Sequence, residues 1–187
     1  MCNNSTNLKD INDDFYAKLD SIFGNINDWL KFAEQKNAAL LLLNGGIIWG
    51  VTRVLDKMTV TSMSSCFIFF AYVLTVASAL ICLTSFLPVL NQKWFKPKEK
   101  SPSDNCLYFA HAAKYGANDY LKLLAKKLNY ENSKIEFTEF EVDLAKQIVT
   151  NSEIALDKYN KFKLATYCTI FAVVVFLLSI GIIKFME

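Results

Sequence analysis

The sequence predicts an all-α integral membrane protein with three transmembrane helices and a small cytosolic helical bundle. Of its 187 residues, 53% are hydrophobic, and these are concentrated in three blocks of the chain. Residues 66–90 form 25 consecutive positions without a charged side chain, and residues 164–183 form 20. A helix needs about 20 apolar residues to cross the hydrocarbon core, and a helix satisfies its own backbone there. Both blocks are therefore predicted to span a membrane.

The N-terminal part of the chain is predicted to be a flexible tail followed by an amphipathic helix. Residues 1–12 are polar and rich in asparagine, so we expect them to be flexible. Residues 13–37 carry hydrophobic side chains every three or four positions, which predicts a cytosolic helix running into the first span. Positive charge is sparse on its polar face, which favours packing against a partner helix. The hydrophobic positions are Phe15, Leu19, Ile22, Phe23, Ile26, Trp29 and Ala33.

Residues 38–55 are predicted to form the first transmembrane helix, which is short. Only 16 uncharged residues separate Lys36 from Arg53, and as a helix they would cover about 24 Å. The two basic side chains can extend toward the membrane surfaces and lengthen the span. A buried helix or a re-entrant segment is the alternative for this block.

This first span contains Asn44, Gly45, Gly46 and Gly50 within its most hydrophobic stretch. Gly46 and Gly50 form a small-xxx-small motif, which lets helices approach closely in lipid, and Asn44 can form an interhelical hydrogen bond. Packing is one role for these residues. The other is to soften or line a space between helices that opens on activation, because intramembrane polar groups often mark such paths. On the second span, residues 66–90, the matching small face would comprise Ala71, Thr75 and Ala79.

Residues 91–163 are predicted to lie on the cytoplasmic side of the membrane. They carry 13 lysines, whereas the connector 53–65 between the first two spans holds only Arg53 and Lys57. Positive residues mark the cytoplasmic side, although the rule weakens for long segments. We therefore expect a multi-pass protein whose N-terminus shares the cytoplasmic side with residues 91–163.

The cytosolic region is predicted to begin with a linker and two short helices. Pro97 and Pro102 discourage helix in the linker. A first short helix is expected to end at Gly116, and Asn118 or Asp119 is expected to cap the second. The apolar stripe of the second helix comprises Leu121, Leu124, Ala125 and Leu128.

The last cytosolic helix is predicted to continue without a break into the third span, residues 164–185. Thr138 and Glu141 match a capping box that opens it, and no Pro or Gly interrupts residues 139–179. One face of this helix is apolar, and a polar stripe borders that face. The stripe is either a solvated flank or the polar wall of a cytosolic pocket. It comprises Asp143, Gln147, Asn151 and Lys158.

Composition argues against several classes of function. A formal net charge of +2 does not suggest binding to a nucleic acid polymer. The five cysteines have no paired spacing, which argues against a disulfide framework or a zinc site. A lone histidine, scattered carboxylates and no glycine-rich phosphate loop leave no visible catalytic chemistry. We therefore expect no enzyme activity, no metal and no cofactor.

Three stretches of the chain resemble the Pycsar transmembrane effector family of bacterial anti-phage defence. They are EQKNAALLLLNGGI at 34–47, CLYFAHAAK at 106–114 and DLAKQIVTNSEIALDKY at 143–159. The third is the most specific, and the first departs at Glu34 and Asn37, where the family pattern has Asp and Ala. The resemblance covers about residues 30–185.

The resemblance implies a receptor for a cyclic nucleotide that a partner cyclase makes on phage infection, with a cyclic pyrimidine mononucleotide favoured. Binding would disrupt the bacterial inner membrane and cause abortive infection. About 100 cytosolic residues bury little core, so we expect a homo-oligomer. In the stripe and beside it, Lys158, Lys114 and Asn151 suit a phosphate, and Gln147 and Tyr108 suit a base. Asp143 completes this candidate ligand set.

Two alternatives remain open from the sequence. The first is a passive membrane anchor or scaffold whose cytosolic helices bind a protein partner. The second is a constitutive, holin-like toxin, which the polar stripe disfavours.

Overall fold

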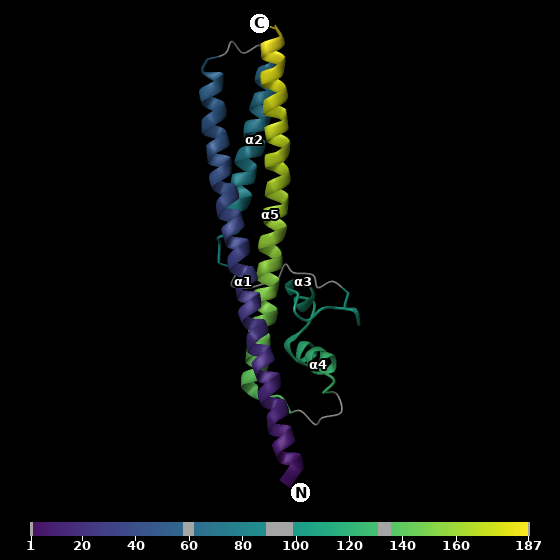
Figure 1. The fold of residues 1–187 in the computed structure, drawn as a ribbon. Helices are drawn as coiled ribbons and strands as arrows, with labels where there is room; N and C mark the ends of the chain where they lie inside the picture. Colours follow the sequence, from purple (N-terminus) through teal and green to yellow (C-terminus); the bar gives the residue numbers. More distant parts are fainter. Residues whose placement is uncertain (1, 58–61, 89–98, 131–135, 187) are drawn as a thin grey trace. The chain divides into compact units, whose positions relative to one another are not determined.

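The computed structural model describes residues 2–57, 62–88, 99–130 and 136–186, and every regular element within these ranges is an α-helix (Figure 1). Three of the helices are long and apolar enough to cross a membrane. The predicted fold class is therefore confirmed. The helices are α1 (Cys2–Leu55), α2 (Ser62–Thr84), α3 (Phe109–Ala112), α4 (Ala117–Lys127) and α5 (Glu139–Met186).

The chain forms two compact units. The α4 unit comprises Met1–Phe32 and Val89–Leu156, and the α2 unit comprises Ala33–Pro88 and Asp157–Glu187. Because α1 and α5 are long, each contributes one part of its length to the α4 unit and another part to the α2 unit.

The start of α5 follows from the predicted capping box. The backbone N–H of Thr138 donates to Glu141 Oε2 at 2.7 Å, and the N–H of Glu141 donates to Thr138 Oγ1 at 3.2 Å. These reciprocal bonds satisfy donors that the first turn leaves without helical partners. From there α5 runs without a break to Met186, as the absence of Pro and Gly up to Ser179 predicted.

α1 is also one helix, and it includes both the amphipathic segment 13–37 and the first span 38–55. Residues 2–12 form its first turns, and the flexibility that we expected for them stays a prediction. In the α4 unit its buried side chains recur every three or four residues, as the hydrophobic spacing predicted. They are Phe15, Leu19, Ile22 and Ile26.

α2 begins at Ser62 and ends at Thr84, so the helix is offset from the predicted segment 66–90. The N–H groups of Ser85, Phe86 and Leu87 donate to carbonyls three residues earlier, which is the 3₁₀ pattern of a tightening last turn. Pro88 disfavours α geometry at the residue before it, and this ends the helix. Residues 89 and 90 lie outside the described part of the chain.

α4 begins earlier than the sequence suggested. Its N-cap is Gly116 and no side chain caps it, so the expected cap at Asn118 or Asp119 is wrong. Both residues lie within the first turn of α4, where the Asp119 carboxylate accepts from Lys100 Nζ at 2.7 Å. An acidic group at this end of a helix is favourable because the helix dipole is positive there. At the other end, Asn129 has φ 60°, the left-handed geometry that often terminates a helix.

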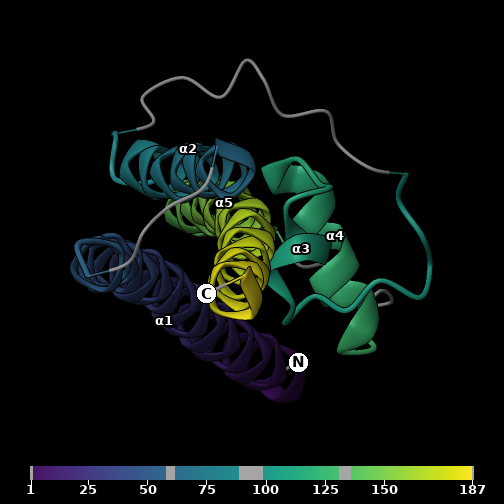
Figure 2. The same ribbon diagram turned by 90° about the horizontal axis from the view of Figure 1, so that it is seen from above.

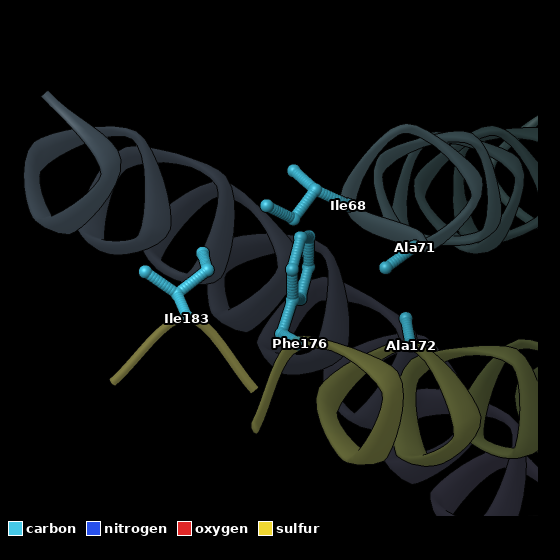
Figure 3. Close-up of a cluster of buried hydrophobic side chains, with 5 residues drawn as sticks. All are labelled: Ile68, Ala71, Ala172, Phe176 and Ile183. Carbon is cyan, nitrogen blue, oxygen red and sulfur yellow. The ribbon is translucent and has the colours of Figure 1, made fainter. Parts of the chain in front are cut away.

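The α2 unit is a bundle of three helix segments, from α1, α2 and α5 (Figure 2). One of its apolar clusters comprises Ile68, Ala71, Ala172, Phe176 and Ile183. The Phe176 ring points toward Ile68, and Ala71 faces Ala172 (Figure 3). The ring of Tyr72 meets Phe176 edge-on at 5.1 Å. The outer surface of the bundle carries large exposed apolar side chains, including Leu42, Trp49, Phe69, Leu80 and Leu177.

Candidate functional site

The polar stripe of α5 lies on the surface of the α4 unit. Asp143 and Gln147 are exposed, and Asn151 is partly buried. Asn151 Nδ2 donates to Asn27 Oδ1 of α1 at 2.8 Å. A carboxamide carries two donors and one acceptor, so this bond uses only part of the capacity of each side chain. We call the surface formed by Asp143, Gln147, Asn151 and Asn27 the amide face.

Two predicted ligand residues lie elsewhere in the α4 unit, at the segment around α3. The Tyr108 ring lies 4.8 Å from that of Phe109, which in turn lies 5.6 Å from Trp29 of α1. Asn25 Nδ2 of α1 donates to the carbonyl of Leu107 at 3.4 Å. Trp29 and Asn25 lie one helical turn apart on the same side of α1.

The α3 segment and the amide face therefore occupy different sides of α1. At about 100° per residue, Asn25 and Asn27 point about 200° apart. The structure brings Asp143, Gln147 and Asn151 together, but it does not bring Tyr108 to them.

Lys114 belongs to a buried ion pair. Its Nζ donates to Asp104 Oδ1 at 2.6 Å, while the Tyr115 hydroxyl and the Ser101 N–H donate to Oδ2 at 2.9 and 2.8 Å. Burial alone would raise the pKa of Asp104, but these hydrogen bonds outweigh it and lower the pKa to about 2. Burial and the contact with Asp104 raise the pKa of Tyr115 to about 12. The Lys114 ammonium thus holds this segment together.

Lys158 lies in the α2 unit and not on the amide face. Its Nζ donates to the carbonyl of Ser85, just past the end of α2, and lies 3.2 Å from Glu34 Oε1 of α1. The carbonyl of Lys158 accepts from Asn37 Nδ2 at 3.2 Å. This one residue therefore links three parts of the bundle.

Asn44 makes hydrogen bonds to both other helices of the bundle. Its Nδ2 donates to Ser78 Oγ of α2 at 2.9 Å, and its Oδ1 accepts from Thr169 Oγ1 of α5 at 2.8 Å. Ser78 Oγ in turn donates to the carbonyl of Ala165 at 2.8 Å. The cost of burying an asparagine among apolar helices is thereby offset.

Gly45, Gly46 and Gly50 do not pack closely within the chain. A Cβ at any of them would meet no atom within 4 Å. Asn44 occupies the buried position, and the following two residues turn about 100° and 200° away from it. The small-xxx-small motif therefore has no close helix contact within the chain, and its role in packing or in lining a space that opens stays a prediction.

The chain matches a known family over nearly its whole length. Residues 18–184, which include most of both units and all of α2, α3 and α4, match the model of the Pycsar effector protein domain. The chain belongs to this family. No curated protein and no solved structure matches it.

Membership in the Pycsar effector family supports a role in anti-phage defence. The family implies a membrane setting and a cyclic nucleotide signal, and it is not a known enzyme family. Within the described residues of this Pycsar effector, no group of three or more His, Cys, Asp or Glu side chains could hold a metal ion.

Besides Asn44, several residues of this Pycsar effector are buried between the helices without having been predicted, although a spacing of seven residues marks them. The spacing links Asn37 to Asn44 in α1. In α2 and α5 it links two longer series, in which each member is small, polar or charged and each is buried. They are Ser64, Ala71 and Ser78 of α2 with Ser85 just past its end, and Lys158, Ala165, Ala172 and Ser179 of α5.

Proposed function

We propose that this protein binds a cyclic nucleotide at the amide face and in response permeabilises the bacterial inner membrane as a homo-oligomer. The observation that carries the proposal is the continuity of α5. This one helix provides Asp143, Gln147 and Asn151 on the α4 unit and buried core residues of the membrane bundle. A ligand that changes the position of its first half acts on a helix that enters the membrane.

The chemistry of the amide face suits a nucleotide. Gln147 and Asn151 can donate to and accept from a base edge, and Asp143 can accept a hydroxyl or amino hydrogen. Lys146 is exposed and its Nζ lies 2.7 Å from Asp143, so a cation for the phosphate is at hand. Tyr108, Lys114 and Lys158 contact other residues of the protein here. Their assignment to the ligand stays a prediction.

A cyclic nucleotide acts as a switch only if it binds the open state more tightly than the closed one. Moving the equilibrium from 1:99 to 99:1 requires about 10⁴-fold tighter binding to the open state. Without the nucleotide, such an equilibrium keeps about 99% of the protein in the closed state, even when the protein is abundant. The partner cyclase would supply the signal at the time of infection.

The ligand is tested by thermal shift of the purified protein in detergent. The panel comprises cyclic CMP, cyclic UMP, cyclic AMP, cyclic GMP and cyclic dinucleotides. We expect a cyclic pyrimidine mononucleotide to raise the melting temperature, and Q147A or D143A to weaken binding about tenfold or more. The matched control is T150A, which changes an exposed residue of the same helix. No shift with any nucleotide would contradict the proposal.

The membrane activity is tested by inducible expression with and without a nucleotide cyclase, read by a membrane-potential dye. We expect depolarisation only when both are present. A passive anchor would give no depolarisation in either case, and a constitutive toxin would give it without the cyclase. Either result would replace the proposed function.

A further inference from the structure

The bundle of the α2 unit is apolar on its outside, and on its inside buried polar residues occur among the apolar core residues. These polar residues recur at intervals along all three helices of the bundle. We call the set of these residues the polar column. It comprises Asn37, Asn44, Ser64, Thr75, Ser78, Ser85, Lys158, Thr169 and Ser179.

The middle of the polar column is a hydrogen-bonded network of neutral oxygen-bearing groups. Asn44 bonds to Ser78 and Thr169, and the hydroxyls of Ser78 and Thr169 lie 2.8 Å apart. The Ala165 carbonyl, 3.1 Å from Thr169 Oγ1, is an alternative acceptor for the single hydrogen of that hydroxyl. These groups carry no charge, and each hydroxyl can rotate to present its oxygen. If the helices separate, these oxygens can solvate water or a small ion.

One end of the polar column is occupied by the Lys158 ammonium. The side chain is only 7% exposed, and it contacts the Ser85 carbonyl and the Glu34 carboxylate. The carbonyl end of α2 carries the negative pole of that helix. An ammonium ion therefore occupies a place that favours positive charge.

Two buried side-chain oxygens, on residues that contact the backbone or the ammonium of Lys158, have no hydrogen-bond partner. They are Asn37 Oδ1 and Ser85 Oγ, and both side chains are buried. Asn37 already donates its N–H groups to the carbonyls of Ala33 and Lys158, so its free oxygen can only accept. Buried oxygens left in this way are suited to a cation or to a water that accompanies one.

Further along, an apolar cluster interrupts the polar column. Phe176 and Ile183 of α5, which flank Ser179 along the helix, belong to one apolar cluster with Ile68 of α2 (Figure 3). A hydrophobic constriction excludes water and ions without any charge. The closed bundle is thus sealed by an apolar cluster and occupied at one end by a fixed ammonium.

We propose that the polar column is the path of the membrane leak, that its permeant species are small monovalent cations, and that the Lys158 ammonium is a tethered cation that holds it closed. This rests on the proposed membrane-permeabilising function. When the Lys158 ammonium leaves, the Ser85 carbonyl and the Glu34 carboxylate that it contacts remain. Oxygen ligands with a net negative charge select cations over anions.

The test measures potassium flux from liposomes that contain the purified full-length protein, without any nucleotide. We expect K158M, which keeps the length of the side chain and removes its charge, to raise the basal flux about tenfold or more. K158R restores the charge and is expected to restore the low flux. K161M is the matched control, because Lys161 also approaches an α2 carbonyl, that of Thr84 at 3.5 Å, but is 29% exposed. K161M is expected to leave the flux unchanged.

The path and its selectivity are tested in the leaky background. S78A and T169V remove oxygens with little change of shape, and combined with K158M they are expected to lower potassium flux several-fold. A potassium chloride gradient across K158M liposomes should give a potential of the sign set by cation permeability. Calcein, a large anion, should stay inside the liposomes.

Folding is verified by circular dichroism and size exclusion. If K158M does not fold, E34Q replaces it, because Glu34 is 47% exposed and its loss weakens the hold on Lys158; an elevated flux is again expected. A folded variant with wild-type flux, or with chloride or calcein release, overturns the inference.

The wild-type protein with cyclic CMP or cyclic UMP separates this inference from the proposed function. If the wild type leaks potassium with nucleotide while K158M liposomes show no raised flux, the proposed path is contradicted and the proposed function is supported. A cation-selective leak in K158M, together with a wild type that no nucleotide opens, supports the path and contradicts nucleotide gating.

Discussion

Asp104 shows how one residue can organise an irregular segment. Its carboxylate accepts hydrogen bonds from Ser101 before it and from Lys114 and Tyr115 after it. These bonds stabilise the segment around α3, where helical backbone hydrogen bonds are few. The sequence did not reveal this pair, because residues ten apart in an irregular segment have no fixed geometry. By contrast, the positions of Asp143, Gln147 and Asn151 on one face could be predicted, since helical spacing is local.

The Asp104 cluster predicts a specific dependence of stability on pH. The folded pKa is about 2, and an unfolded aspartate has a pKa of about 3.9. Because the pKa is lowered on folding, the stabilisation is complete above about pH 4 and is lost as the pH falls through about 2. Thermal unfolding in detergent at a series of pH values measures this loss. D104N should lack this pH-dependent step; an unchanged step in D104N would show that another group causes it.

Asn44 predicts a modest cost on substitution. Interhelical hydrogen bonds in membranes contribute about 0.6–1.7 kcal/mol, so N44A should lower the free energy of unfolding by about 1 kcal/mol. Ser78 and Thr169 keep their bonds to the Ala165 carbonyl, which limits the loss. L43A, at an exposed neighbouring position, is the control. A larger loss for L43A than for N44A would contradict the assignment of Asn44 to the core.

At the scale of elements, helix starts and ends were predictable where a local signal exists. The Thr138–Glu141 capping box marked the start of α5, and the absence of Pro and Gly predicted its continuity. The end of α2 was missed because a run without charges does not reveal the effect of Pro88. The direction of the Lys158 side chain and the Asn27–Asn151 bond depend on how helices pack, which one helix alone does not determine.

If the continuous helix α5 transmits the signal, a flexible position introduced in its middle should uncouple ligand binding from membrane activity. Asn160 and Lys163 are exposed, and each Gly in a helix costs about 1 kcal/mol relative to Ala. The double variant N160G/K163G should bind nucleotide as well as N160A/K163A does, but it should depolarise cells less. Equal depolarisation by the two variants would show that the continuous helix does not transmit the signal.

The open surroundings of Gly46 and Gly50 predict the effect of a methyl group there. No atom obstructs a Cβ, and Ala is a better helix former than Gly by about 1 kcal/mol. G46A and G50A should therefore leave the stability of the protein in detergent unchanged or raise it. A fall of more than about 1 kcal/mol would indicate a close helix contact at these positions.

At the scale of the whole molecule, the distribution of polarity agrees with a lipid setting. The bundle of the α2 unit presents large apolar side chains outward and buries small polar ones, whereas the segment between the second and third spans belongs to the α4 unit up to Leu156. Family membership and the three apolar helices show a membrane protein. Composition predicted the three apolar helices, because hydrocarbon excludes charge from long segments.

The proposed orientation is tested by labelling with a membrane-impermeant maleimide in intact cells. Asp56 and Ser103 are both exposed, and the proposal places them on opposite sides of the inner membrane. In a cysteine-free background, D56C should react from outside, and S103C should react only after the membrane is opened. The reverse pattern would place the amide face outside the cytoplasm and contradict a cytosolic signal.

The sharing of α1 and α5 by both units limits how this protein can be divided or recombined. The α4 unit cannot be excised by itself, because α1 and α5 supply its core and continue into the α2 unit. Exchange of whole domains with another protein is therefore not open to this chain. Only stepwise substitution along the exposed sides of the two shared helices would change one unit while keeping the other.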